Sequence, residues 1–207
     1  MKYIWINPVT DGMYERHVLE QMLNRHGYKR VEVSEDWLLV VRKKYENIVK
    51  KTDKPVVDVR CPMAAELVKK LVDESAYEFP EIWPILLHCG YEIAKKEELQ
   101  GKEIIITTPC LALADQGNTL GYRNVRFVPW NLFLEELNET PEIAFKKETP
   151  IPLGFFEELG VDIMSLTGEK EIRNYFQNHK EQLPALIEML YCHNGCHNGD
   201  GIIQKES

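Results

Sequence analysis

Short apolar segments of β type alternate with amphipathic helical segments along this chain, and that alternation constrains the fold more than any other feature. Such alternation is typical of α/β proteins with a largely parallel sheet. The predicted strands are Tyr3–Ile6, Val56–Val59, Glu103–Thr107 and Val125–Val128. The predicted helices cover residues 13–26, a segment capped by Ser34, the segment beginning at Pro62, and residues 81–96, 168–179 and 183–191.

A polar segment over residues 138–154 interrupts the alternation. Its three prolines, Pro141, Pro150 and Pro152, favour a surface connection between two lobes. A chain of 207 residues is long enough for one substantial core or for two small lobes that share one. We therefore expect an α/β protein of two small lobes with largely parallel sheets. Residues 1–54 would form an N-terminal α/β lobe segment and residues 55–207 the ligand-binding region, and the two together would make one compact domain overall.

The five cysteines are an odd number in a chain whose first residues, Met1–Pro8, are too short an apolar stretch for a signal peptide. We therefore expect a cytoplasmic protein with reduced thiols rather than a disulfide framework. The net charge of −8 leaves no basic surplus to neutralise phosphates, which argues against nucleic acid as a partner. No apolar run approaches the roughly 20 residues that span a bilayer, which argues against a membrane partner.

Four cysteines occupy positions that favour ligand binding. Cys61 and Cys110 each follow a predicted strand, and the carboxyl ends of strands are where open α/β sheets bind ligands. Cys192 and Cys196 lie four residues apart in a glycine-rich stretch that ends at Gly201, where glycines permit tight curvature around an inorganic group. A 4Fe–4S cluster takes four thiolates, so these four cysteines are candidate ligands for one.

Other interpretations of the cysteines remain open at this point. A lone cysteine is usually a small buried apolar residue, and Cys89, between His88 and Gly90, fits that description. Zinc is a second candidate, because four cysteines, or cysteines with His193 or His197, can form a tetrahedral site. Unligated thiols are the third interpretation.

Three short motifs resemble the signatures of iron-only hydrogenases, and they occur in the order found in that family. The segment Glu188–Gly201 resembles the third signature, in which a glutamate and a methionine precede two cysteines among glycines. The segment Val57–Pro62 resembles the first signature, Thr-Ser-Cys-Cys-Pro, and Thr108–Leu113 is similar to the second, which contains Met-Pro-Cys. The resemblance covers roughly residues 55 to 203, and the stretch between Cys110 and Cys192 is much shorter than in the family.

The resemblance implies a 4Fe–4S cluster bound by Cys61, Cys110, Cys192 and Cys196, between the two lobes at the strand ends. In the family, the last of these cysteines also bridges to a two-iron unit that carries CO and cyanide. Cys196 would be that bridge if an additional iron unit were present.

The departures from the family concern its hydrogen chemistry. Arg60 stands where the family has the cysteine that delivers protons, and an arginine that is always charged cannot relay them. Leu113 stands where the family has a lysine that donates a hydrogen bond to cyanide. We therefore expect a hydrogenase-like iron–sulfur protein without H2 chemistry, which acts in electron transfer, redox sensing or cluster handling with a redox or iron–sulfur partner protein.

Two other functions stay open from the sequence. A divergent hydrogenase-type oxidoreductase would carry the additional iron unit at Cys196, and a zinc-stabilised module would use the cysteines for structure. For the oxidoreductase, the candidate acid–base residues near the cluster are Arg60, His88, His193, His197 and Asp200.

Overall fold

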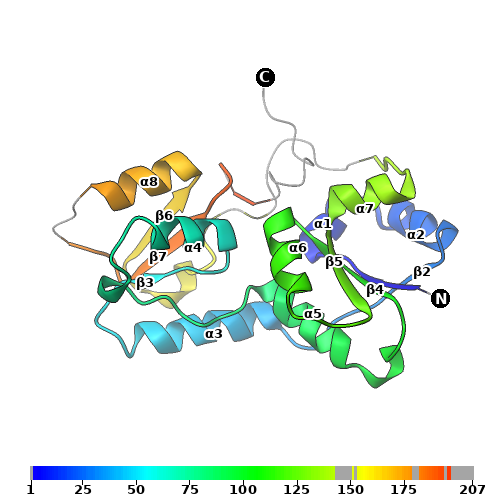
Figure 1. Ribbon diagram of the computed structural model, residues 1–207, viewed down its shortest axis with the longest axis horizontal. Helices are drawn as coiled ribbons and strands as arrows, with labels where there is room; N and C mark the ends of the chain where they lie inside the picture. The colour runs from blue at the N-terminus through cyan, green and yellow to red at the C-terminus, as the bar shows by residue number, and fades with distance from the viewer. Residues whose placement is uncertain (1, 143–150, 152, 179–181, 194, 197–207) are drawn as a thin grey trace. The chain divides into compact units, whose positions relative to one another are not determined.

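The computed structural model describes residues 2–142, 151, 153–178, 182–193 and 195–196 (Figure 1). The described residues form two compact units, each with its own sheet. Unit 1 comprises those of residues 1–35 and 86–150, and unit 2 comprises those of 36–85 and 151–196. Each unit is thus assembled from separate stretches of chain, and the predicted boundary after residue 54 falls inside unit 2.

Unit 1 is built on a four-stranded, all-parallel sheet. Its elements are β1 (Lys2–Trp5), α1 (Pro8–Asp11), α2 (Arg16–Arg25), β2 (Tyr28–Arg30), α5 (Ile85–Lys95), the short 3-10 helix η2 (Glu97–Leu99), β4 (Ile104–Thr108), α6 (Leu111–Asn118), β5 (Val125–Pro129) and α7 (Trp130–Leu137). The strand order is β2-β1-β4-β5, with Ile4 opposite Ile105. Every residue of β4 is buried, as expected for a central strand of a parallel sheet that is covered on both faces.

Different helices cover the two faces of this sheet (Figure 1). On one face, Leu19 of α2 and Trp130 of α7 join Val128 of β5 in a buried apolar cluster. On the other face, Gly90 of α5 and Gly117 of α6 both lie against the ring of Phe127, the neighbouring residue of β5. The alternation of side chains along β5 therefore separates the two halves of the core.

Unit 2 is built on a three-stranded, all-parallel sheet in the order β3-β7-β6. Its elements are α3 (Trp37–Val49), β3 (Val56–Val57), α4 (Pro62–Lys69), η1 (Glu74–Ala76), η3 (Glu157–Leu159), β6 (Ile163–Thr167), α8 (Glu169–Gln177) and β7 (Leu186–Leu190). Leu67 of α4 and Ile172 of α8 pack in one apolar cluster with Ile187 of β7. Tyr45 of α3 and Phe156 pack in a second cluster that includes Leu186.

The predicted α/β class with largely parallel sheets is confirmed, and both sheets are parallel throughout. The predicted helix over residues 183–191 is wrong, because Leu186–Leu190 forms β7, the central strand of unit 2. All five residues of this strand are buried, and a short apolar run fits a buried strand and a buried helix equally well by its periodicity. The cap of α3 is Asp36, which accepts a hydrogen bond from the Leu39 amide, rather than the predicted Ser34.

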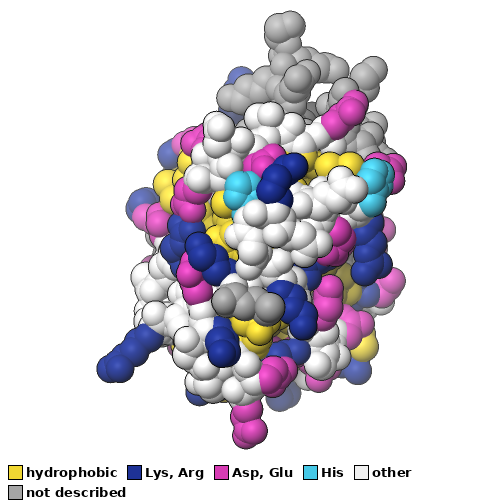
Figure 2. Space-filling model, turned by 90° about the vertical axis from the view of Figure 1, so that its right-hand side faces the viewer, with side chains coloured by type: hydrophobic (Ala, Val, Ile, Leu, Met, Phe, Trp, Pro, Cys, Tyr) yellow, Lys and Arg dark blue, Asp and Glu magenta, His cyan; other side chains and the backbone are white. Residues whose placement is uncertain are grey.

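The face of the molecule in Figure 2 carries positive and negative side chains that are interspersed. Ion pairs of unit 1 such as Arg126–Glu136, 2.6 Å apart, join half-exposed partners. Exposed pairs of this kind contribute about 0–1 kcal/mol each. The stability of unit 1 therefore depends mainly on its apolar core.

Replacing Gly117 by alanine is expected to destabilise the protein by about 1–3 kcal/mol, because the added methyl group would overpack the core at that point. A Cβ at this position would lie 2.4 Å from Cγ of Phe127. A glycine-to-alanine change within a helix otherwise stabilises by about 1 kcal/mol, so the sign of the effect isolates the ring contact. Urea denaturation followed by circular dichroism measures the change, with Phe127→Leu/Gly117→Ala as the relieved control. A more stable Gly117→Ala protein would contradict the packing described.

Candidate functional site

Two of the predicted cluster ligands lie at the carboxyl end of the sheet of unit 2. β3 and β7 are parallel neighbours, with Val57 opposite Ile187, so both strands end at the same edge. Cys61 lies four residues after the end of β3, and Cys192 lies two residues after the end of β7. Cys192 therefore follows a strand and not the predicted helix, which places it at the same type of position as Cys61.

Cys61 is the residue immediately before α4, and Pro62 begins the helix as predicted. Its thiol is partly buried against the apolar cluster of α4 and α8. Burial raises the pKa of this thiol above its ordinary value, while hydrogen bonds from the backbone of Tyr191 and Ala64 lower the pKa in part. Tyr191 directly precedes Cys192, so the backbone that carries the second cysteine contacts the sulfur of the first.

Cys196 also belongs to unit 2 and is partly buried. Its backbone N–H donates a hydrogen bond of 3.0 Å to the carbonyl oxygen of Ile151. The residue before it, Gly195, has φ of 119°, a value that favours glycine over any residue with a side chain. This turn is consistent with the tight curvature predicted for the glycine-rich stretch.

Cys110 belongs to unit 1, unlike the other three candidate ligands. It follows β4 and precedes α6, so its predicted position after a strand is confirmed. The hydroxyl of Thr108 donates a 2.8 Å hydrogen bond to the Cys110 carbonyl oxygen, which fixes the turn between the two elements. Leu113, two residues into the same helix, is buried.

Within the residues that the structure describes, no three or more His, Cys, Asp and Glu side chains are arranged to hold a metal ion. The donor chemistry of the four cysteines fits an iron–sulfur cluster, and two of the four share one sheet edge. The complete ligand set therefore stays a prediction.

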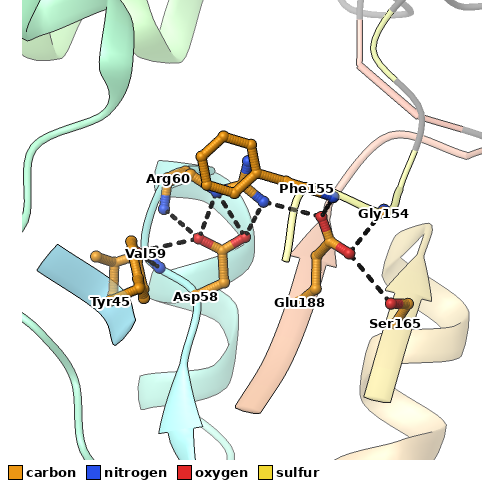
Figure 3. Close-up of polar contacts among 8 residues, drawn as sticks. All are labelled: Tyr45, Asp58, Val59, Arg60, Gly154, Phe155, Ser165 and Glu188. Carbon is orange, nitrogen blue, oxygen red and sulfur yellow. Dashed lines mark hydrogen bonds and ion pairs between the residues drawn. The ribbon is translucent and has the colours of Figure 1, made fainter. Parts of the chain in front are cut away.

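A buried ion network at the same edge of unit 2 was not predicted from the sequence (Figure 3). Asp58 follows β3, Glu188 lies within β7, and the guanidinium of Arg60 bridges the two carboxylates. Nη2 of Arg60 lies 2.8 Å from Oδ2 of Asp58 and 3.0 Å from Oε1 of Glu188. The two carboxylate side chains are 0% and 1% exposed, so the charges are removed from water. We call these three residues the Arg60 clamp.

Other donors complete the hydrogen bonds of the two carboxylates (Figure 3). Asp58 accepts a 3.1 Å hydrogen bond from the hydroxyl of Tyr45. Glu188 accepts from the amides of Gly154 and Phe155, at 2.8 and 3.0 Å, and from the hydroxyl of Ser165 at 3.1 Å. These hydrogen bonds matter because burying a charge without partners costs several kcal/mol of stability.

The guanidinium also lies over the rings of Phe155 and Phe156, at 3.8 and 4.5 Å from their centroids. Burial lowers the pKa of Arg60, but the charge and hydrogen bonds of Asp58 outweigh that effect, and the pKa lies above its ordinary value. Arg60 therefore stays charged and bonded to both carboxylates. This suits it to holding the strands together and not to the acid–base role considered for it from the sequence.

Two of the remaining acid–base candidates lie among the described residues. His193 is exposed and lines an open hollow of about 860 Å³ beside Gly168 and the first turn of α8. His88 is buried in α5 of unit 1. His197 and Asp200 lie outside the described residues.

The sequence does carry a signal for the clamp. Asp58 and Glu188 each interrupt an apolar run, and acidic residues are almost never fully buried unless they are paired. The pattern identifies no partner, because Arg60 and Glu188 are 128 residues apart.

Comparisons with protein-family models, with curated proteins and with solved structures find no match for this chain. The resemblance to iron-only hydrogenases accordingly stays a prediction. No helix in the described part of the chain combines the length and the apolar character needed to cross a membrane.

The predicted burial of Cys89 is confirmed and leads to a pH effect. Burial raises the pKa of this thiol in α5 to about 12, against about 8.5 for an exposed cysteine. The unfolded chain then loses this proton at a lower pH than the folded chain, so stability falls as the pH rises above about 8.5, by about 2 kcal/mol at pH 10. Unfolding free energies at pH 7 and pH 10 should show this loss in the native sequence and a correspondingly smaller loss in Cys89→Ala. An equal loss in both proteins would show that Cys89 is not buried as described.

Proposed function

We propose that this chain is an iron–sulfur protein, with Cys61 and Cys192 as cluster ligands from one edge of unit 2. The single observation that carries the proposal is that these two cysteines follow neighbouring parallel strands. Cys196, in the same unit, and Cys110, in unit 1, complete the proposed four-thiolate set for a 4Fe–4S cluster.

The surroundings of Cys61 support an anionic group at this edge. A cluster bound through four thiolates is negatively charged, and hydrogen bonds to its sulfurs stabilise it. Cys61 lies at the N-terminus of the eight-residue helix α4, where the helix dipole favours negative charge. The backbone of Tyr191 adds a further hydrogen bond to the Cys61 sulfur.

Binding of a cluster would be coupled to the ionisation of its ligands. Cysteines must lose their protons to bind iron, and the free energy of metal binding adds to that of folding. Cys61 and Cys192 would enter the site from strands that are paired in the fold.

The proposed activity is electron transfer, redox sensing or cluster handling with a redox or iron–sulfur partner protein, without H2 chemistry. Two positions support the loss of that chemistry. Arg60 offers no thiol for proton delivery, and both carboxylates of the clamp engage its guanidinium. Leu113 offers no donor to a cyanide ligand.

Anaerobic purification followed by iron and sulfide analysis tests this function. We expect a brown protein with about four irons and four sulfides per chain. Single serine substitutions of Cys61, Cys110, Cys192 and Cys196 should each remove the cluster or change its electron paramagnetic spectrum. Cys89→Ser is the matched control and should keep the cluster.

Two results would contradict the proposal. A colourless protein that holds one zinc would show that the cysteines form a structural site. Infrared bands of CO and cyanide, after co-expression with hydrogenase maturation proteins, would show that the additional iron unit is present at Cys196.

A further inference from the structure

Two side chains of unit 2 accept hydrogen bonds from the backbone of the turn that precedes Cys61. The amide of Arg60 donates a 3.0 Å hydrogen bond to Oδ1 of Asp58. The amide of Val59 donates a 3.0 Å hydrogen bond to the hydroxyl of Tyr45, which in turn donates to Asp58. The backbone between β3 and Cys61 is therefore fixed by groups that are buried in unit 2.

The same arginine reaches the strand that carries Cys192. Glu188 lies four residues before Cys192 in the sequence and is the central residue of β7. Its other carboxylate contacts attach β7 to Ser165 of β6 and to the backbone of Gly154 and Phe155. Arg60 thus connects the support of one cysteine to the support of the other.

The guanidinium has little freedom to leave this position. Charge-assisted hydrogen bonds hold it in its plane, and the ring of Phe155 covers one of its faces at 3.8 Å. A planar fork that serves two carboxylates at once is a property of arginine, whereas lysine provides a compact point charge.

From these contacts we infer that the Arg60 clamp holds the thiols of Cys61 and Cys192 as a preset pair before any cluster binds. Arg60 is then a positioning residue: it touches no iron, and it acts through Asp58 and Glu188 on the two strand ends. The purpose of this pairing rests on the proposed function, but the pairing itself is a property of the cluster-free chain.

Cross-linking of the two thiols tests the inference in the absence of iron. In the full chain with Cys89→Ala, Cys110→Ser and Cys196→Ser, the remaining cysteines are Cys61 and Cys192. Dibromobimane alkylates each thiolate with loss of bromide and becomes fluorescent when both of its arms have reacted. We expect efficient bridging of the pair with the clamp intact.

Two clamp variants and one control separate positioning from general stability. Arg60→Lys keeps the positive charge but loses the fork, and Glu188→Gln keeps the shape of the side chain but loses its charge. Each should lower the yield of the bridged product about threefold or more at temperatures well below its unfolding transition, while single alkylation continues. Arg42→Gln is the matched control, because Arg42 also lies over Phe155, at 5.1 Å, but pairs with the exposed Glu158.

An unchanged yield in Arg60→Lys and Glu188→Gln, with or without a lower melting temperature, would overturn the inference and leave the clamp a purely structural network. A failure of the native clamp to give the bridged product would overturn it as well. Because this assay contains no iron, a protein that bridges its thiols but binds no cluster refutes the proposed function alone.

Discussion

One interaction joins two strands of the central sheet of unit 2, the contact of the Arg60 guanidinium with two buried carboxylates. Asp58 and Glu188 come from neighbouring strands, and without a cation between them their charges would repel in a medium of low dielectric. Breaking a buried pair by removing one partner typically costs about 3–5 kcal/mol. The hydroxyls of Tyr45 and Ser165 and the amides of Gly154 and Phe155 donate to the same carboxylates, so three separate segments of chain share this support.

The position of the clamp connects the stability of unit 2 to its proposed function. Asp58 and Arg60 lie in the turn after β3, at the edge of the sheet where Cys61 and Cys192 follow their strands. On our proposal, a network that would otherwise serve stability alone also sets the geometry of two cluster ligands. On the same proposal, Arg60 would serve the placement of thiols and not the delivery of protons.

The sequence predicted the α/β class because buried parallel strands and amphipathic helices leave different local patterns, and it placed Cys61 and Cys110 after strands correctly. It failed for Leu186–Leu190, since a buried apolar run acquires its identity from the strands beside it, Val56–Val57 and Ile163–Thr167, which are remote in sequence. The clamp was not predicted from the sequence for the same reason. The acidic residues within apolar runs were visible, but the pairing of Arg60 with Glu188 is a property of the folded sheet.

The measurement that tests this account most directly is an anomalous difference map at the iron absorption edge, from crystals grown without oxygen. The account predicts iron density bonded to the sulfurs of Cys61 and Cys192, beside an intact contact of Arg60 with Asp58 and Glu188. Iron bound away from these two sulfurs, or a fully loaded protein in which Cys192 binds no iron, would contradict it.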